Sequence, residues 1–219
     1  MMRCVIAVLL IGIFSWLNLP AQTGRACVAF HAGTAGAGLD YKYELNKHLS
    51  ARGGFTGAVL SMSSVFETTD FHSDSKLSAR FSNLHLLADY SPFRTIAGLR
   101  LVGGISYFLK AQGDFTVKPT ETYYYGDIPI SDEILGSVKI NVSWHGFAPY
   151  AGVGIIEAVP NRKFNCNIDL GTYYLPRPKS SIAATGLLEG NETQTPVLQR
   201  NLRSFRLLPL LQINFNYKL

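Results

Sequence analysis

The sequence predicts an all-β protein, a closed antiparallel β-barrel that crosses a membrane, and three observations lead to this fold class. The 219 residues are 47% hydrophobic and only 16% charged, whereas soluble domains average about 25% charged residues. Beyond the N-terminus no apolar run reaches the roughly 20 residues of a membrane-spanning helix. Several segments instead alternate apolar and polar residues, as a barrel strand does when one face meets lipid and the other meets the lumen.

Composition also narrows the possible function classes. Aromatic residues make up 12% of the chain, which together with the low charge excludes an intrinsically disordered protein. The length predicts a single domain. The formal net charge is +5, but no run of Lys and Arg follows one element, so we expect no nucleic-acid partner. The five histidines do not show the spacing of metal ligands, so we expect neither a metal site nor a cofactor.

Residues 1–26 have the layout of a secretory signal peptide. Arg3 precedes an apolar stretch that ends at Leu17, and Pro20 follows with several small residues. This stretch is short for a transmembrane helix, so we expect cleavage near residues 21 to 26. The mature chain, residues 27–219, then forms the barrel.

The C-terminal residues 211–219 are the clearest strand of the mature chain. Successive side chains of a strand point to opposite faces, and this segment has one apolar and one polar face. The apolar face carries Leu211, Ile213, Phe215, Tyr217 and Leu219. The same alternation predicts further strands in residues 39–45, 49–59, 99–110, 138–144 and 164–170.

Two segments depart from a plain alternation. The segment from Leu77 to Tyr90 changes its apolar face near Asn83, which predicts a β-bulge. Residues 197–205 are the nearest candidate for a short helix.

The connections between strands predict two different rims. Transmembrane barrels have short periplasmic turns and long external loops. Tight turns, which we assign to the periplasm, fall at residues 46–48, 90–94 and 145–148. Long polar connections fall at residues 62–76, 112–134 and 187–205, and this assignment makes the first two external. The barrel has eight strands if residues 26–44 and 164–185 each form one strand, which we favour, and ten if both segments are split.

Charged residues fall on the polar face of several predicted strands. They are Asp40, Lys42, Glu44, Arg52, Arg100, Lys139 and Asp169. The interior of a barrel of about eight strands is just wide enough for its own side chains. We therefore expect these residues to pair with one another in a polar, largely filled lumen, where their role is structural.

Several short motifs carry a resemblance to one superfamily of membrane proteins. They lie at residues 33–43, 88–93, 149–154 and 168–171 and in the C-terminal strand. Together with the signal peptide they resemble the small outer-membrane β-barrel superfamily, the outer-membrane protein A-like and W-like barrels. The resemblance implies a Gram-negative outer membrane, contact with outer-membrane lipid, and recognition of the C-terminal strand by the outer-membrane insertion machinery. Such signals usually end in Phe, and this chain ends in Leu219.

This fold class leaves three functions open. The first is a non-enzymatic barrel of structural or surface-interaction type, which we expect to be a monomer. The second is a narrow porin-like passage for small molecules or ions. The third is a lipid-modifying enzyme that uses His72, Ser73 or Asp74 in an external loop. Adjacent residues of an extended chain point in different directions, so this triplet does not itself form a catalytic relay. We favour the first function.

Overall fold

Eight antiparallel strands form a closed ring in the computed structural model, which describes residues 25–63, 73–92, 99–125, 127–157 and 163–219. Residues 1–24 of the predicted signal peptide lie outside these residues, as do His72 and the end of the predicted turn 90–94. The ring closes because β8 pairs with β9, β9 with β11 and β11 with β1. In chain order the ring strands are β1 (Ala26–Gly33), β2 (Gly36–Glu44), β3 (Leu49–Ser63), β4 (Ser73–Tyr90), β5 (Leu99–Pro119), β8 (Val138–Glu157), β9 (Phe164–Tyr174) and β11 (Leu207–Lys218).

The predicted fold class and the predicted total of eight strands are confirmed, but the chain is divided differently. Residues 26–44 form two strands, because the chain reverses at Gly33–Gly36 with a φ of 120° at Gly36. The turn predicted at residues 145–148 is wrong, because these residues lie inside β8. Gly146 has a φ of 116°, and the pairing with β5 changes register opposite it. This bulge shifts the alternation of outward and inward side chains by one residue, so the single strand β8 has the sequence pattern of two strands joined by a turn.

Two other local predictions are confirmed. The pairing of β4 with β5 changes register between Ser82 and Asn83, which is the bulge that the change of face near Asn83 predicts. Residues 197–205 are mainly helical, in α3 (Thr195–Asn201) and η2 (Leu202–Ser204).

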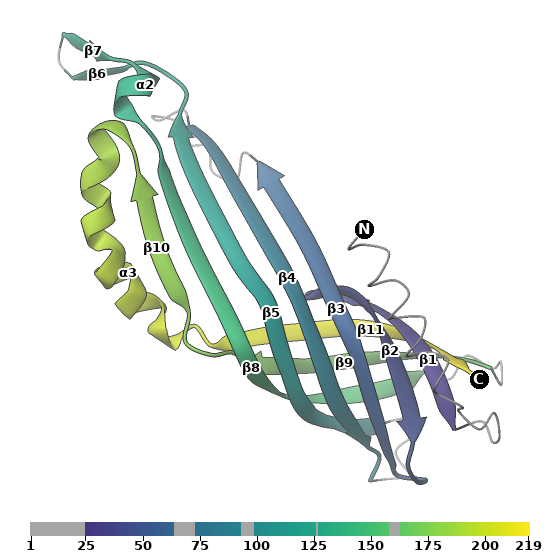
Figure 1. Cartoon of the computed structure of the whole chain (residues 1–219). Coiled ribbons are helices and arrows are strands. Elements are labelled where there is room, and N and C mark those ends of the chain that lie inside the picture. The colour runs from purple at the N-terminus through teal and green to yellow at the C-terminus, as the bar shows by residue number, and fades with distance from the viewer. Residues whose placement is uncertain (1–24, 64–72, 93–98, 126, 158–162) are drawn as a thin grey trace, which may run out of the picture.

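One side of the barrel continues far beyond the closed ring. A strand needs about 9–11 residues to cross a membrane, and β1, β2, β9 and β11 have 8 to 12 residues. The other four ring strands, β3, β4, β5 and β8, have 15 to 21 residues. Figure 1 shows the surplus as an open sheet that β10 (Lys179–Ala184) joins at the side of β8. We call this sheet the extension; it consists of residues 58–63, 73–81, 111–119, 138–143 and 179–184.

Helical residues cover the free edge of the extension at β10. The 3-10 helix η1 (Gly186–Gln194) and α3 run along this strand (Figure 1). The backbone N–H of Ser180 donates to Oε1 of Gln199 at 2.7 Å, and that of Ile182 donates to Oγ1 of Thr195 at 3.2 Å. The N–H of Ala184 donates to Oε1 of Glu192 at 3.1 Å. Side chains thus occupy the donors of an edge that could otherwise pair with another chain.

Two short strands and one helical turn stand at the tip of the extension. They are β6 (Tyr123–Tyr125), β7 (Ile128–Ile130) and α2 (Asp132–Leu135). In the part of the chain that the structure describes, no helix combines the length and the hydropathy needed to cross a membrane.

The ring turns its apolar side chains outward and its polar side chains inward. In β11 the outward residues Ile213 and Phe215 are 42% and 53% exposed, whereas Asn214 between them is 1% exposed. This distribution is the reverse of that in a water-soluble barrel, and lipid is the medium that stabilises it. The other outward residues of the C-terminal strand, Leu211, Tyr217 and Leu219, are exposed as well.

Candidate functional site

Five charged side chains from five different strands meet inside the closed ring. We call them the lumen cluster: Asp40 of β2, Arg52 of β3, Asp89 of β4, Arg100 of β5 and Asp169 of β9. Each is at most 4% exposed, and Asp169 is fully buried. Charges buried in this way are stable only when they are paired and hydrogen-bonded.

Direct ion pairs connect the cluster across the lumen. Arg100 pairs with Asp89 through Nη1 and Oδ2 at 3.0 Å, and its Nη2 donates to Oδ1 of Asp169. Arg52 Nη2 lies 2.8 Å from Oδ2 of Asp169, and Arg52 Nε lies 3.4 Å from Oδ1 of Asp89. Asp40 is more distant, with its Oδ2 3.7 Å from Nη1 of Arg52. Each arginine therefore links Asp89 of β4 to Asp169 of β9, two strands that are not neighbours in the ring.

Lys42 balances the charge of the cluster. Its Nζ lies 2.7 Å from Oδ2 of Asp89, and its side chain is 16% exposed. With Lys42, three cations stand against three carboxylates, so these six side chains together carry no net charge.

Two histidines surround Asp40. His85 Nε2 lies 2.7 Å from Oδ1 of Asp40, and His31 Nδ1 lies 3.3 Å from the same oxygen. His31 also contacts Oγ1 of Thr56 through Nε2 at 2.9 Å. Each carboxylate of the lumen cluster therefore has at least two nitrogen-bearing side chains within ion-pair distance.

Amide side chains extend the network to β11. Asn214 donates through Nδ2 to Oδ1 of Asn167 at 2.6 Å and to Oδ2 of Asp169 at 3.0 Å. Arg100 Nη2 also donates to Oδ1 of Asn167, at 2.6 Å. One hydrogen-bonded network thus reaches strands on opposite sides of the ring.

Glycines make room for these side chains. A Cβ on Gly54 would overlap Oδ1 of Asp40, and a Cβ on Gly154 would overlap both Arg100 and Asp169. The close approach of backbone to buried side chains explains glycine at these two strand positions.

An aromatic layer fills a second part of the lumen. Phe108 is fully buried, and its ring meets that of Tyr173 edge-on, with 5.3 Å between centroids. Tyr150 lies 4.8 Å from Tyr173 by the same measure and is 4% exposed. Ala35, at the reversal between β1 and β2, and Leu175, just beyond β9, belong to the same apolar cluster. This layer therefore lies toward the rim that carries the extension.

The structure brings together five of the seven residues that the sequence predicts for the lumen: Asp40, Lys42, Arg52, Arg100 and Asp169. It leaves out Glu44, which is exposed at the opposite rim from the extension. It also leaves out Lys139, whose side chain is 56% exposed. The ring is not closed at the height of Lys139, so the inward face of β8 meets solvent there.

Lys139 instead belongs to a polar group on the extension. Its Nζ lies 3.9 Å from Oδ1 of Asp114. Asp114 accepts hydrogen bonds from Asn141 at 2.8 Å and from Gln112 at 2.9 Å. Although burial alone would raise the pKa of the Asp114 carboxyl, these hydrogen bonds, with Lys139 and Arg80 nearby, hold that pKa below its usual value.

Sequence reasoning missed several members of the network. Asp89 and His85 follow the bulge in β4, and the alternation counted from Tyr90 would have placed both inward. Asn167 and Asn214 stand on the predicted polar faces but carry no charge, so they were not singled out. His31 shares the inward face of β1 with Ala29.

The ion pairs of the lumen cluster can hold the strands of the ring together. General acid–base or nucleophilic catalysis requires a group within reach of a substrate, whereas these side chains are nearly inaccessible and paired with one another. Among the described residues, no group of three or more His, Cys, Asp or Glu has an arrangement suited to a metal ion.

Comparison with known proteins supports the architecture. No family model and no curated protein sequence matches the chain. The crystal structure of CarO from Acinetobacter baumannii superposes with a TM-score of 0.65 at 19% identity, covering 88% of this chain and 97% of CarO. CarO2 from the same organism superposes with a TM-score of 0.67 at 18% identity, covering 89% of this chain and 98% of CarO2. The closed ring, its apolar outward surface and this likeness show that the chain has the fold of a small transmembrane β-barrel.

Proposed function

We propose that this protein is a non-enzymatic outer-membrane barrel whose filled lumen anchors an extracellular sheet that contacts molecules outside the cell. The observation that carries the proposal is the filling of the lumen by two layers. Arg100 and Asp169 of the lumen cluster are 1% and 0% exposed, and Phe108 of the aromatic layer is 0% exposed. Side chains thus occupy the space through which a solute would have to pass.

The energetics of the lumen cluster favour a permanent plug over a gate. Removing one partner of a buried ion pair typically costs about 3–5 kcal/mol, because the other charge stays buried without compensation. A solute that crossed the ring would have to separate Arg52 and Arg100 from Asp169, which joins them. Opening the lumen is therefore expensive, and a closed barrel is the state that the ion pairs favour.

The extension supports a role at the surface. Its strands project beyond the ring on the side opposite the tight turn at 46–48 (Figure 1). It carries charged side chains that meet solvent, among them Lys76, Lys118 and Lys139. A sheet held at a distance from the membrane suits contact with other molecules.

Assembly fits the same proposal. The outward apolar face of β11 is what the outer-membrane insertion machinery would recognise, after the signal peptide of residues 1–26 directs export. Within the closed ring each strand has a partner on both sides, and we propose that the protein acts as a monomer surrounded by outer-membrane lipid.

Single-channel recording in planar bilayers tests the filled lumen. We expect the wild-type protein to remain silent at a protein load at which a general porin gives regular conductance steps. Phe147→Ala, which changes a 66% exposed outward side chain of β8, should be equally silent. Reproducible unitary steps from the wild-type protein would refute the filled lumen and favour a narrow porin-like passage.

A lipid-modifying activity requires a separate test. Ser73 and Asp74 are the first two residues of β4, where neighbouring side chains point to opposite faces. We expect unchanged mass spectra of lipid A after overexpression of the protein. A new lipid A species that disappears in Ser73→Ala would contradict the non-enzymatic proposal.

A further inference from the structure

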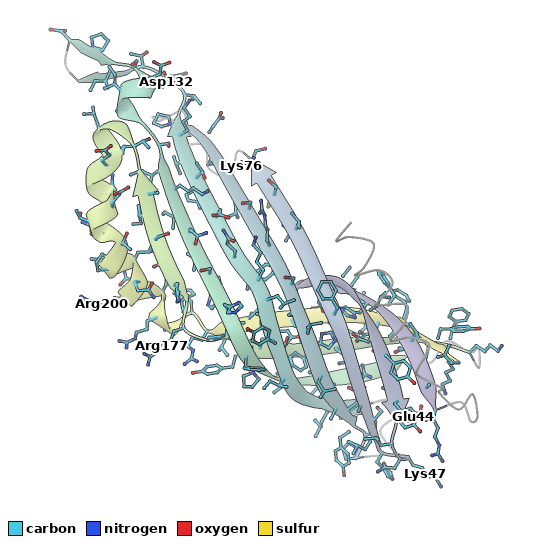
Figure 2. The ribbon with its side chains drawn as sticks, viewed as in Figure 1. Glu44, Lys47, Lys76, Asp132, Arg177 and Arg200 are labelled. Carbon is cyan, nitrogen blue, oxygen red and sulfur yellow. The ribbon has the colours of Figure 1, made fainter. Side chains whose placement is uncertain are left out.

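A basic pocket lies outside the ring, beside the end of α3. It has a volume of ≈ 360 Å³ and is lined by Arg177, Pro196, Gln199, Arg200 and Arg203. Arg177 belongs to the link between β9 and β10. Arg200 lies at the end of α3, and Arg203 lies in η2. Figure 2 shows Arg177 and Arg200 close together at the end of the helix that is nearer the ring.

The backbone that carries these arginines is held in place. Arg177 stands between Pro176 and Pro178, whose rings restrict the backbone on both sides of it. Gln199 donates through Nε2 to the carbonyl oxygen of Pro178 at 2.5 Å. Its Oε1 accepts from the N–H of Ser180 at 2.7 Å and from the Ser180 hydroxyl at 3.0 Å. The helix and the Pro-Arg-Pro link are thus joined through Gln199.

The charge of the pocket is uncompensated. Among the described residues, Arg177, Arg200 and Arg203 form no ion pair, in contrast to both arginines of the lumen cluster. Arg200 and Arg203 are three residues apart, a spacing at which like charges on a helix repel each other. An anion bound between the guanidinium groups would relieve this repulsion.

Neighbouring residues show the level at which the pocket lies. Two and four positions after Arg203, the outward side chains of Phe205 and Leu207 are 63% and 66% exposed. Arg206 is already engaged, because its Nη1 donates to the Tyr174 hydroxyl at 2.7 Å and its Nε donates to the Leu175 carbonyl at 2.9 Å. The pocket therefore lies where the apolar outer surface of the ring ends, which is the level of lipid headgroups.

We propose that this pocket binds phosphate groups. Guanidinium groups bind phosphate through two parallel N–H···O bonds, with better geometry than an ammonium group can offer. Two sources would supply this chemistry: a phosphorylated glycolipid of the outer leaflet, or a soluble phosphorylated molecule. The level of the pocket favours the lipid. The proposal extends the surface role proposed above, and it is independent of whether the lumen conducts.

Native mass spectrometry of the detergent-solubilised full-length protein tests the proposal. The probes are bisphosphorylated lipid A, lipid A from which the phosphates have been removed, and inorganic pyrophosphate. The test variant is Arg177→Gln/Arg200→Gln/Arg203→Gln. The control variant, Lys47→Gln/Lys163→Gln/Lys218→Gln, removes the same charge from exposed positions at the end of the barrel opposite the extension. Heat-modifiable gel migration verifies that both variants are folded.

We expect the wild-type protein and the control variant to bind bisphosphorylated lipid A in preference to the dephosphorylated form. The test variant should bind bisphosphorylated lipid A at least about tenfold more weakly, since a single charge-assisted hydrogen bond can account for such a factor. The corresponding Arg→Lys variant should lie between the two.

Further outcomes separate the two sources of phosphate. Competition by pyrophosphate, lost in the test variant, would support the proposal with a soluble molecule as the source. Preference for bisphosphorylated lipid A without such competition would support the lipid. Equal binding of bisphosphorylated lipid A by the test and control variants, with no binding of pyrophosphate to the pocket, would overturn the proposal.

Discussion

Removal of the charge of Asp169 should destabilise the barrel strongly. Asp169 is fully buried and accepts from Arg52, Arg100 and Asn214. Asp169→Asn keeps the shape of the side chain but leaves three cations facing two carboxylates. Breaking a buried ion pair in this way costs about 3–5 kcal/mol. Two hydrogen bonds to charged groups, at about 1.5–3 kcal/mol each, amount to a similar loss.

Urea unfolding of the folded barrel in detergent micelles measures this loss. The fraction of folded protein is read from heat-modifiable gel migration and from tryptophan fluorescence. The matched control is Asp132→Asn, whose carboxyl is 39% exposed and lies 3.7 Å from Nζ of Lys118. An exposed pair of this kind contributes at most about 1 kcal/mol. The urea concentration at the midpoint of unfolding should therefore fall far more for Asp169→Asn than for Asp132→Asn.

A double variant separates loss of charge balance from simple loss of contacts. Arg52→Gln combined with Asp169→Asn restores equal numbers of cations and carboxylates in the lumen. The double variant should lose less stability than the sum of the two single variants, with a coupling of about 0.5–3 kcal/mol. If Asp169→Asn and Asp132→Asn lose the same stability, the ion pairs of the lumen do not hold the barrel together, and the reasoning fails.

Two further predictions concern backbone positions. Gly154→Ala should lower the free energy of unfolding by about 1–3 kcal/mol, because the new methyl group overlaps Arg100 and Asp169. The control, Gly113→Ala, places a methyl group that meets no atom within 4 Å and should be neutral in the same urea assay. Equal effects of the two substitutions would contradict the tight packing around Gly154. Glu192→Ala combined with Thr195→Val frees the N–H groups of Ala184 and Ile182 at the edge of β10, so this variant should associate through that edge in light scattering. Thr193→Val, whose hydroxyl bonds within η1, is the control, and an equally monodisperse double variant would show that the edge needs no cover.

Most of the fold could be predicted because lipid on one side of the wall and a polar lumen on the other impose a period of two. The same physics allowed the bulge near Asn83 to be predicted, because a bulge shifts the alternation by one residue. It fails at Gly146, where an equivalent shift of the alternation predicts a turn that the structure does not contain. The sequence predicts the extension only in part. Residues 138–144 are correctly predicted as a strand, whereas the predicted long connections 62–76 and 112–134 include parts of β3, β4 and β5. These parts run outside the closed ring, so their two faces lack the contrast between lipid and lumen.

The candidate site could be predicted only in part. The face of each strand is a local property, and it correctly separated Arg52 and Arg100 from their outward neighbours. Contact among Asp40, Asp89 and Asp169 depends on the register of β2, β4 and β9 around the ring, which no single strand records. Lys139 shows the limit: its face follows from the alternation, but its exposure follows from where the ring closes.

The sequence by itself determined that the chain is a transmembrane β-barrel with charged residues on its inner face, because the alternation of apolar and polar residues along a strand is a local property of the sequence. Only the tertiary structure decided which charges meet, where the ring ends and the extension begins, and how Arg177 joins Arg200 and Arg203. The physical reason is that these features depend on pairing between distant segments. Closure of the ring and its shear bring together residues that lie more than a hundred positions apart, as with Arg52 and Asp169.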